Sequence, residues 1–149
     1  MIDGYGRTID YVRISVTDRC NLRCVYCMPE EGVGSISHEE ILRFGEIERV
    51  CQILAENGIQ KIKLTGGEPL VRRRLQELAA ALKQIPGIKS LTITTNGVLL
   101  EEMYDALADA GVDSVTISLD TLDASVYRQL TRRDEIEAVR RGLRTAIQK

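Results

Sequence analysis

The sequence predicts an α/β protein: a partial, open (β/α) barrel of the TIM type with about four βα units. Short alternating segments and longer helical patterns follow one another four times without a low-complexity linker, as in a parallel sheet. Crossovers between parallel strands are almost always right-handed, so the strands should follow one another around a curve. A complete barrel takes roughly 250 residues, whereas this chain has 149. We therefore expect residues 1–149 to be the N-terminal part of a longer domain.

The first half of the chain contains two predicted strands and one predicted helix. Residues 11–17 alternate apolar and polar side chains, which is typical of a half-buried strand. Ser37, with Glu40 three residues later, forms a capping box that predicts a helix start. Apolar residues at helical spacing continue this helix until Asn57-Gly58 stops it. Residues 61–65 form the second alternating segment, which ends at Gly66.

The second half repeats the same order of elements. A helix is predicted from about residue 72 to 85, where Pro86-Gly87 ends it. A third strand follows at 88–95, closed by Asn96-Gly97, and then a helix at 99–110 and a fourth strand at 112–119. Asp123 can cap a short helix to about residue 131. Apolar residues at helical spacing over 136–147 predict one more helix.

Alternation divides each predicted strand into an apolar and a polar face, because residues two apart point the same way. The apolar faces should pack on the helices, and the polar faces should then line the inside of the curve as a wet, partly cationic cavity. The alternative is an open antiparallel sheet with one solvated face, which the helical pattern between every pair of strands disfavours. The polar set consists of Arg13, Ser15, Thr17, Lys61, Lys63, Thr65, Thr92, Thr94, Asn96, Ser114, Thr116, Ser118 and Asp120.

Composition excludes some functions and suggests a compartment. A net charge of −2, from 20 basic and 22 acidic residues, gives no electrostatic footprint for nucleic acid. No apolar run approaches the ~18 residues of a membrane span. Three of the four cysteines are crowded together, which indicates a metal site in a reducing compartment rather than a secreted disulfide framework. We therefore expect a cytoplasmic protein.

The crowded cysteines are Cys20, Cys24 and Cys27, directly after the first predicted strand. Three thiolates can hold three irons of a four-iron cube and leave the fourth iron open for chemistry. The alternative is a structural zinc site with His38 as the fourth ligand. Zinc sites usually take ligand pairs from two knuckles, and no second pair exists here, so we favour the open cluster. Cys51 lies on an apolar helical stripe and is expected to be a buried small hydrophobe.

Other conspicuous residues follow the ends of the later strands, the edge at which parallel α/β folds bind ligands. Gly66-Gly67 would let the backbone approach a ligand, and Glu68 offers a carboxylate to an ammonium group; the alternative is a plain strand-ending turn. The run 72–74 contains three arginines, which are disfavoured at a helix N-terminus. This run is either a solvated helix start or part of an anion-binding rim.

These motifs resemble the radical S-adenosylmethionine (SAM) superfamily. The cysteine spacing, with Tyr26 before the last cysteine, and the Gly-Gly-Glu-Pro element one βα unit later both fit that superfamily. Longer stretches are similar to the GTP 3′,8-cyclase family of molybdenum cofactor biosynthesis, and the resemblance covers nearly the whole chain. These stretches are Gly6-Arg7, Arg13 to Asn21, Cys27 to Pro29, Leu64 to Leu70, Thr94 to Gly97 and Ser118 to Asp120.

The resemblance implies a radical SAM barrel and a set of roles. Cys20, Cys24 and Cys27 would bind a [4Fe–4S] cluster whose open iron takes SAM. Tyr26, Gly67, Glu68 and Ser118 would contact SAM, and Arg13, Lys61, Lys63 and Thr94 would bind GTP. The implied reaction is abstraction of the 3′ hydrogen of GTP by a 5′-deoxyadenosyl radical, followed by cyclisation to (8S)-3′,8-cyclo-7,8-dihydroguanosine 5′-triphosphate. The implied partners are an electron donor such as flavodoxin or ferredoxin, a downstream pterin-forming enzyme and possibly a second copy of the chain.

The chain also departs from the family pattern. Lys63 stands where many relatives carry arginine, and arginine and lysine bind anions with different geometry. The family's second three-cysteine cluster, near its C-terminus, has no counterpart here. We therefore expect this chain to hold a cluster without completing the cyclisation. Two alternatives stay open: another radical SAM enzyme acting on a peptide or small molecule, and a non-catalytic zinc- or cluster-binding domain.

Overall fold

The structure is a computed structural model that describes residues 2–32, 34 and 40–149. Its centre is a parallel four-stranded sheet in the order β1-β2-β3-β4, with neighbouring strands in register. The strands are β1 (Tyr11–Ser15), β2 (Lys61–Thr65), β3 (Ser90–Thr95) and β4 (Ser114–Ile117). The prediction of a parallel sheet built from βα units is confirmed, and the antiparallel alternative is wrong.

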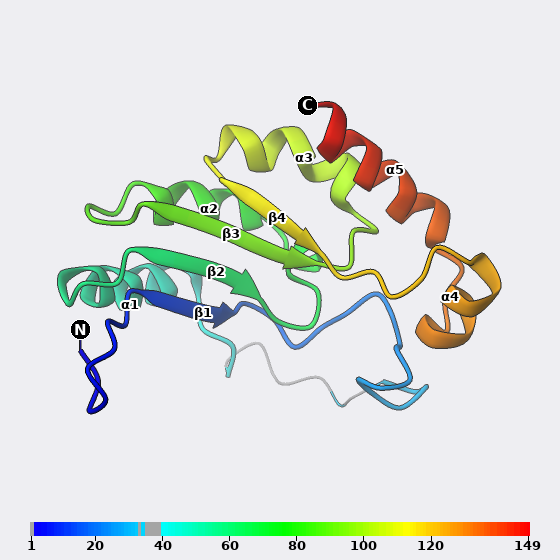
Figure 1. Ribbon diagram of the computed structural model, residues 1–149, viewed down its shortest axis with the longest axis horizontal. Coiled ribbons are helices and arrows are strands. Elements are labelled where there is room, and N and C mark those ends of the chain that lie inside the picture. The colour runs from blue at the N-terminus through cyan, green and yellow to red at the C-terminus, as the bar shows by residue number, and fades with distance from the viewer. Residues whose placement is uncertain (1, 33, 35–39) are drawn as a thin grey trace.

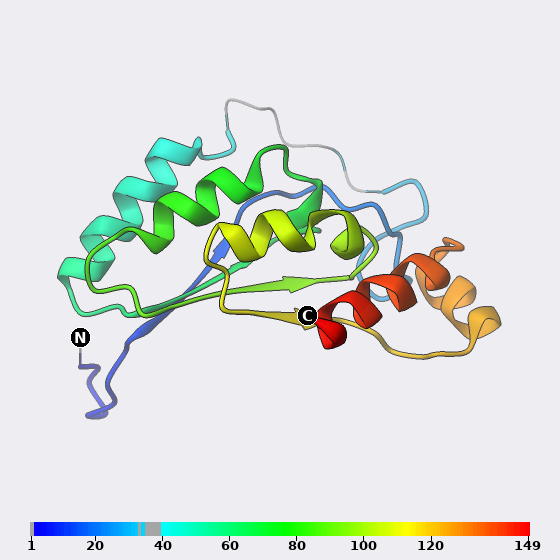
Figure 2. The same cartoon turned by 90° about the horizontal axis from the view of Figure 1, so that it is seen from above.

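Helices α1 (Phe44–Glu56), α2 (Leu75–Lys83) and α3 (Leu100–Asp109) cover one face of the sheet and leave the other face open (Figures 1 and 2). α5 (Ile136–Gln148) packs beside α3, and α4 (Ala124–Thr131) lies beyond the C-terminal ends of the strands. Within the described part of the chain, no helix has the length and apolar character needed to cross a bilayer.

The two faces of the sheet differ as the alternation predicts. Apolar side chains of β2 and β3 are at most 1% exposed and pack against buried leucines of α2. The intervening polar residues, including Arg13 and Thr94, are exposed or half-buried. The buried strand residues are Ile62, Leu64, Leu91 and Ile93. Burial of the apolar face supplies the main driving force of the fold, and the polar face stays available for a ligand.

Two helices begin later than predicted. α1 begins at Phe44, where the Glu46 side chain accepts a hydrogen bond from the Arg43 backbone N–H at 2.6 Å. Ser37 lies outside the described residues, and the capping box that starts the helix is the one at 43–46. α2 begins at Leu75, because Arg74 adopts the left-handed region with φ of 63°.

The arginine run 72–74 is therefore not the first turn of a helix. Arg72 follows the short 3₁₀ turn η1 (Pro69–Val71), and its guanidinium donates to the backbone carbonyls of Val16 and Leu42. The guanidinium also stacks over the Phe44 ring, 4.5 Å from its centroid. Arg72 thus ties the end of β1 to the segment before α1. This position explains how a cation occurs so close to the start of α2.

β1 and β4 are shorter than predicted, although their pairing continues past their ends. The Val16 N–H donates to the Thr65 carbonyl at 2.8 Å, and the Ser118 N–H donates to the Thr95 carbonyl at the same distance. Thr17 was expected on the polar face but is 7% exposed. It lies beyond β1, at the start of the cysteine loop, and is covered by the neighbouring glycines.

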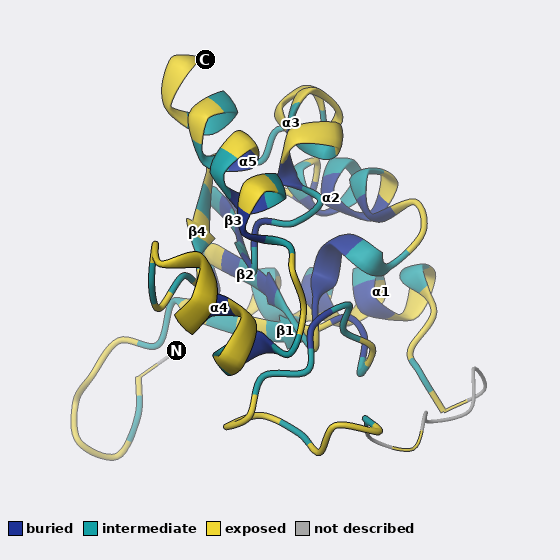
Figure 3. Cartoon of the chain, turned by 90° about the vertical axis from the view of Figure 1, so that its right-hand side faces the viewer, coloured by how far each residue is buried: buried dark blue, intermediate teal, exposed yellow. Residues whose placement is uncertain are grey.

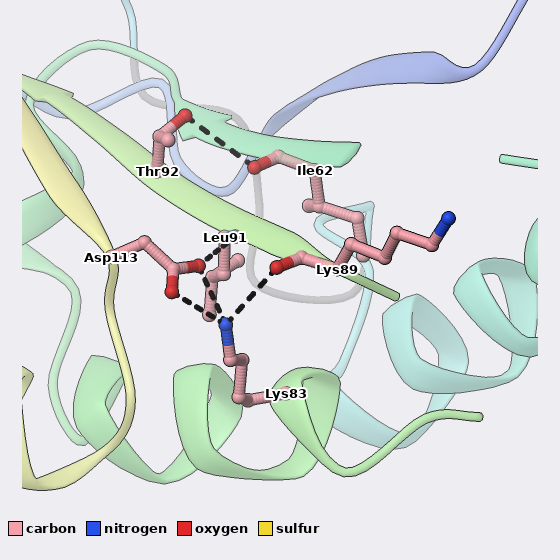
Figure 4. Close-up of polar contacts among 6 residues, drawn as sticks. All are labelled: Ile62, Lys83, Lys89, Leu91, Thr92 and Asp113. Carbon is pink, nitrogen blue, oxygen red and sulfur yellow. Dashed lines mark hydrogen bonds and ion pairs between the residues drawn. The ribbon is translucent and has the colours of Figure 1, made fainter. Parts of the chain in front are cut away.

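A polar cluster fixes the N-terminal edge of the sheet, opposite the predicted site (Figure 4). The carboxylate of Asp113, just before β4, accepts from the Lys83 ammonium at 2.6 and 2.7 Å. It also accepts from the Leu91 N–H at 2.6 Å. These bonds join the end of α2 to β3 and β4, so the edge away from the strand ends has a structural role.

A second, smaller core positions α4. Tyr127, Ile136 and Val139 are at most 4% exposed and pack with Val98, Ile117 and Leu119. Asp123 caps α4 as predicted, since its carboxylate accepts from the N–H groups of Ser125 and Val126. This packing holds α4 against the C-terminal edge of the sheet.

Candidate functional site

A cavity of about 250 Å³ opens at the C-terminal ends of the strands. Figure 3 looks onto this edge, where α4 lies with an exposed outer side. The cavity collects most of the predicted site residues, although they are spread over some hundred positions of sequence. Its lining includes Cys20, Cys24, Tyr26, Cys27, Gly67, Glu68, Thr94 and Ser118, together with Thr95, Asn96, Asp120, Tyr127 and Thr131.

The cysteine loop begins pressed against the glycine-containing loop after β2. The Gly67 N–H donates to the Thr17 carbonyl at 2.8 Å, and the Glu68 N–H donates to the Arg19 carbonyl at 2.7 Å. A Cβ added at Gly67 would lie 2.3 Å from the Arg19 carbonyl oxygen, and one at Gly66 would lie 2.4 Å from that of Thr17. The close approach that requires glycine here is thus to the chain's own backbone.

The end of α4 holds the second half of the cysteine loop. The Arg23 N–H donates to the Thr131 carbonyl at 3.0 Å. The Arg132 guanidinium donates to the carbonyls of Arg23 at 3.2 Å and Met28 at 3.1 Å, which bracket the last two cysteines. Arg132 itself has φ of 54°, a conformation uncommon outside glycine. The loop is therefore fixed by segments more than a hundred residues away.

Asn96, directly after β3, supports the first cysteine. Its side-chain amide donates to the Asn21 side-chain oxygen at 2.7 Å, and the amide nitrogen lies 3.9 Å from the Cys20 sulfur. Asn96 was predicted to lie on the polar face, without a predicted role. Its position at a strand end was the available signal.

Glu68 is a carboxylate buried at the base of the cavity, with 2% of the residue exposed. Its oxygens accept from the Thr95 hydroxyl at 2.7 Å, the Leu70 N–H at 3.0 Å and the Asn96 N–H at 2.6 Å. Burial raises the pKa of Glu68, and these three hydrogen bonds offset part of that rise. No cation of the described residues is among its partners, so a cationic ligand group would stabilise this carboxylate.

Tyr26 and Asp120 meet at the rim of the cavity. The Tyr26 hydroxyl donates to the Asp120 carboxylate at 2.5 Å. This bond raises the pKa of Tyr26, with burial as the next cause. Asp120 was predicted to lie on the polar face and belongs to one of the family-like stretches, without a predicted role. The structure adds it to the site as the partner of Tyr26.

Tyr127, on α4, is a site residue that the sequence analysis missed. It is 4% exposed and lines the cavity, and its hydroxyl has no hydrogen-bond partner among the described residues. Burial, followed by the nearby Cys24 thiol, raises the pKa of Tyr127 to about 12. An aromatic residue at helical spacing is typical of a core position, so no local pattern indicated a polar role for Tyr127.

The cationic residues predicted to bind a nucleotide lie away from this cavity. Arg13 of β1 and Lys63 of β2 are register partners on the open face, and neither forms an ion pair within the described part of the chain. Lys61 lies at the start of β2, where its ammonium pairs with Asp10 at 2.9 Å. Thr94, the uncharged member of the four residues predicted to bind GTP, is the one that lines the cavity.

The donor set at the cavity suits an iron–sulfur cluster. Cys20 and Cys24 are half-buried and Cys27 is exposed, and all three are free thiols. Burial raises the pKa of the Cys20 and Cys24 thiols, so a metal that binds thiolates would stabilise their charged form. Among the described residues no three His, Cys, Asp or Glu side chains are grouped as for a single metal ion. A cube suits more widely spaced thiols, since each binds a different iron.

Two further residues bear on the metal-site prediction, His38 as a possible zinc ligand and Cys51 as the fourth cysteine. His38, the fourth ligand of the zinc alternative, lies outside the described residues. Cys51 is 0% exposed and belongs to the main core, so its prediction as a buried hydrophobe is confirmed.

The comparisons with known sequences agree on one superfamily. A family model described as the radical SAM superfamily matches residues 14–149. The GTP 3′,8-cyclase of Pelotomaculum thermopropionicum is 54% identical over 147 residues, which are 99% of this chain and 45% of that protein. The enzyme of the same name from Petrotoga mobilis is 49% identical over 99% of this chain and 46% of its own length. The chain thus spans a little under half the length of these relatives.

Solved structures show the same fold. Methylornithine synthase, PylB, superposes with a TM-score of 0.72 at 20% identity, over 93% of this chain and 41% of that one. The [FeFe]-hydrogenase maturase HydG gives a TM-score of 0.66 at 17% identity, over 90% of this chain and 32% of that one. At these identities the similarity concerns the fold.

Proposed function

This chain belongs to the radical SAM superfamily, and from that premise we propose that it is the N-terminal part of a GTP 3′,8-cyclase of molybdenum cofactor biosynthesis. The observation that carries the proposal is the convergence of three thiols, Glu68 and Ser118 on one cavity at the strand ends. The high identity to proteins named GTP 3′,8-cyclase supports the choice of reaction within the superfamily.

Cys20, Cys24 and Cys27 would hold a [4Fe–4S] cluster at this cavity, and SAM would bind beside it. When bound and reduced, the cluster supplies the electron that cleaves SAM into methionine and a 5′-deoxyadenosyl radical. Glu68 would accept the ammonium group of SAM, because a buried carboxylate without a cation favours such a ligand. Tyr26, Gly67 and Ser118, which line the same cavity, would complete the SAM site.

GTP would lie on the open face of the sheet. Arg13 and Lys63 are adjacent like charges without a counter-ion in the described part of the chain, so a phosphate group would relieve their repulsion. Thr94 would connect this face to the cavity. Lys61 remains a candidate for the phosphates, since its exposed ion pair with Asp10 is of a weak kind that exchanges readily.

The wider setting follows from the proposed reaction. The cytoplasm provides the reducing compartment, a flavodoxin or ferredoxin would deliver the electron, and a pterin-forming enzyme would take the product. The barrel strands and second-cluster region beyond this chain would supply the rest of the GTP site, and a homodimer is compatible with the proposal.

The proposal is tested by anaerobic reconstitution of the chain with iron and sulfide, followed by iron analysis and EPR of the reduced sample. We expect about four irons per chain and the signal of a reduced [4Fe–4S] cluster. Cys24→Ala should abolish the signal, whereas Cys51→Ala should retain it, because Cys51 lies in the core. Zinc in place of iron, or a cluster signal unaffected by Cys24→Ala, would overturn the proposal.

A further inference from the structure

The cavity contains a buried polar group that has no hydrogen-bond partner in the described part of the chain and no role in the proposed function. This group is the Tyr127 hydroxyl, which is fully enclosed and makes no hydrogen bond to the described residues. The tyrosine ring packs in the second core with Ile136 and Val139, while the residue also lines the cavity that contains Cys20 and Cys24. The ring is thus anchored in the second core and borders the cavity that the thiols also line.

An enclosed hydroxyl without a partner destabilises the folded state, because it has given up its hydrogen bonds to water without replacing them. Phenylalanine would fill the same core position without that cost. The Thr131 side chain lies beside the phenol, but its one hydroxyl proton points to the backbone carbonyls of Tyr127 at 2.8 Å and Arg133 at 3.0 Å, and it forms no hydrogen bond with the Tyr127 hydroxyl. The hydroxyl therefore needs a partner that enters the cavity.

The neighbours of the hydroxyl indicate which partner enters. The Tyr127 phenol interacts electrostatically with the Cys24 thiol, the Glu135 carboxylate and the Cys20 thiol, and the Thr131 side chain lies beside it. Of these groups, Cys20 and Cys24 line the same cavity as Tyr127 and are proposed cluster ligands. A sulfur atom of the bound cluster would therefore offer the O–H an acceptor inside this cavity.

We propose that the Tyr127 hydroxyl donates a hydrogen bond to a sulfur of the cluster held by Cys20, Cys24 and Cys27, and so raises the cluster's reduction potential. Reduction adds negative charge to the sulfurs, and a donor stabilises the reduced form more than the oxidised form. The inference rests on the proposed function, since it requires the cluster. Tyr127 takes no part in bond breaking; it adjusts how readily the cluster accepts its electron.

The test is Tyr127→Phe, which removes one oxygen and keeps the ring. We expect unchanged iron content after reconstitution. In an EPR-monitored redox titration without SAM, the ratio of reduced to oxidised cluster at a fixed potential should fall about tenfold, which is about 59 mV for one electron. The matched control is Tyr104→Phe, on α3 and outside the cavity, which should leave the midpoint potential unchanged.

The cluster-free protein gives a second readout. Because the hydroxyl has no partner in the chain, Tyr127→Phe should unfold at the same urea concentration as the parent chain or at a higher one. Marked destabilisation would show that the hydroxyl is bonded within the chain and would overturn the inference.

Three outcomes of the reconstitution and of the titration, which is run first without and then with SAM, contradict the inference in different ways. A potential equal to that of the parent chain and of Tyr104→Phe overturns it while leaving the proposed function intact. A shift that appears only after SAM is added assigns the hydrogen bond to SAM and overturns the sulfur assignment. Failure of the parent chain to bind any cluster overturns both proposals together.

Discussion

Replacement of Gly67 by alanine tests how the cysteine loop is held to the sheet. The new Cβ would lie 2.3 Å from the Arg19 carbonyl oxygen and 2.7 Å from both the Arg19 carbonyl carbon and the Asp18 carbonyl oxygen. All three are backbone atoms, so no side-chain rotation can relieve the overlap. The start of the cysteine loop must therefore move away from the loop after β2.

The cost follows from the bonds that join these two loops. Separation breaks the hydrogen bonds from the Gly67 N–H to the Thr17 carbonyl and from the Glu68 N–H to the Arg19 carbonyl. Each contributes about 0.5–1.5 kcal/mol, and a buried group left unpaired adds to the loss. We expect Gly67→Ala to lower the free energy of unfolding by about 2–3 kcal/mol.

Urea denaturation of the cluster-free chain measures this loss. Gly45→Ala is the matched control, because Gly45 lies in α1 and a Cβ there would meet nothing within 4 Å. Alanine in a helix is favoured over glycine by about 1 kcal/mol, so the control should be slightly more stable than the parent chain. Equal urea midpoints for Gly67→Ala and the parent chain would refute the role given to the glycine loop.

Three further substitutions test the roles of Glu68, Lys63 and Lys61. Because burial raises the pKa of Glu68, the folded state binds its proton more tightly than the unfolded state, and stability should fall as pH rises from about 4.5. Glu68→Gln should remove this dependence of the free energy of unfolding on pH. It should also lower that free energy by about 1–3 kcal/mol at low pH, since the glutamine amide cannot accept from all three donors. Urea denaturation at several pH values measures both effects, and an equal pH dependence in the parent chain and the variant would contradict the prediction. Lys63→Ala should weaken GTP binding about tenfold, because one charged contact is lost, and Lys61→Ala should weaken it less. Calorimetry measures both affinities. An unchanged affinity for Lys63→Ala would exclude Lys63 from the GTP site.

The repeating features of the fold were predictable from the sequence. Alternation in residues 11–15 and 61–65 gave the two faces of the sheet, and the helical patterns between strands required parallel pairing. Parallel pairing in turn placed the C-terminal ends of all four strands at one edge of the sheet. The convergence of Cys20 and Glu68 on one cavity therefore followed from the order of the elements along the chain. These predictions rest on local periodicity, which the tertiary structure preserves.

The remaining features depend on contacts between distant segments. The capping box that begins α1 is the Arg43–Glu46 pair, although Ser37 and Glu40 also fit the capping-box pattern. Local sequence does not show which of the two pairs begins the helix. The partner of Gly67 is the backbone of the cysteine loop, a contact that no pattern encodes. Tyr127 has the spacing of a core residue, and only the assembled cavity shows that its hydroxyl is enclosed without a partner.

The response of the reduced cluster to SAM shows directly whether Cys20, Cys24 and Cys27 hold a cluster with one iron free to bind a ligand. These three residues line the cavity that contains Glu68, so SAM bound there would contact that iron. EPR spectra of the reconstituted, reduced chain should change when SAM is added, and the change should weaken in Glu68→Gln. A cluster spectrum that stays identical with and without SAM would contradict the presence of such an open iron.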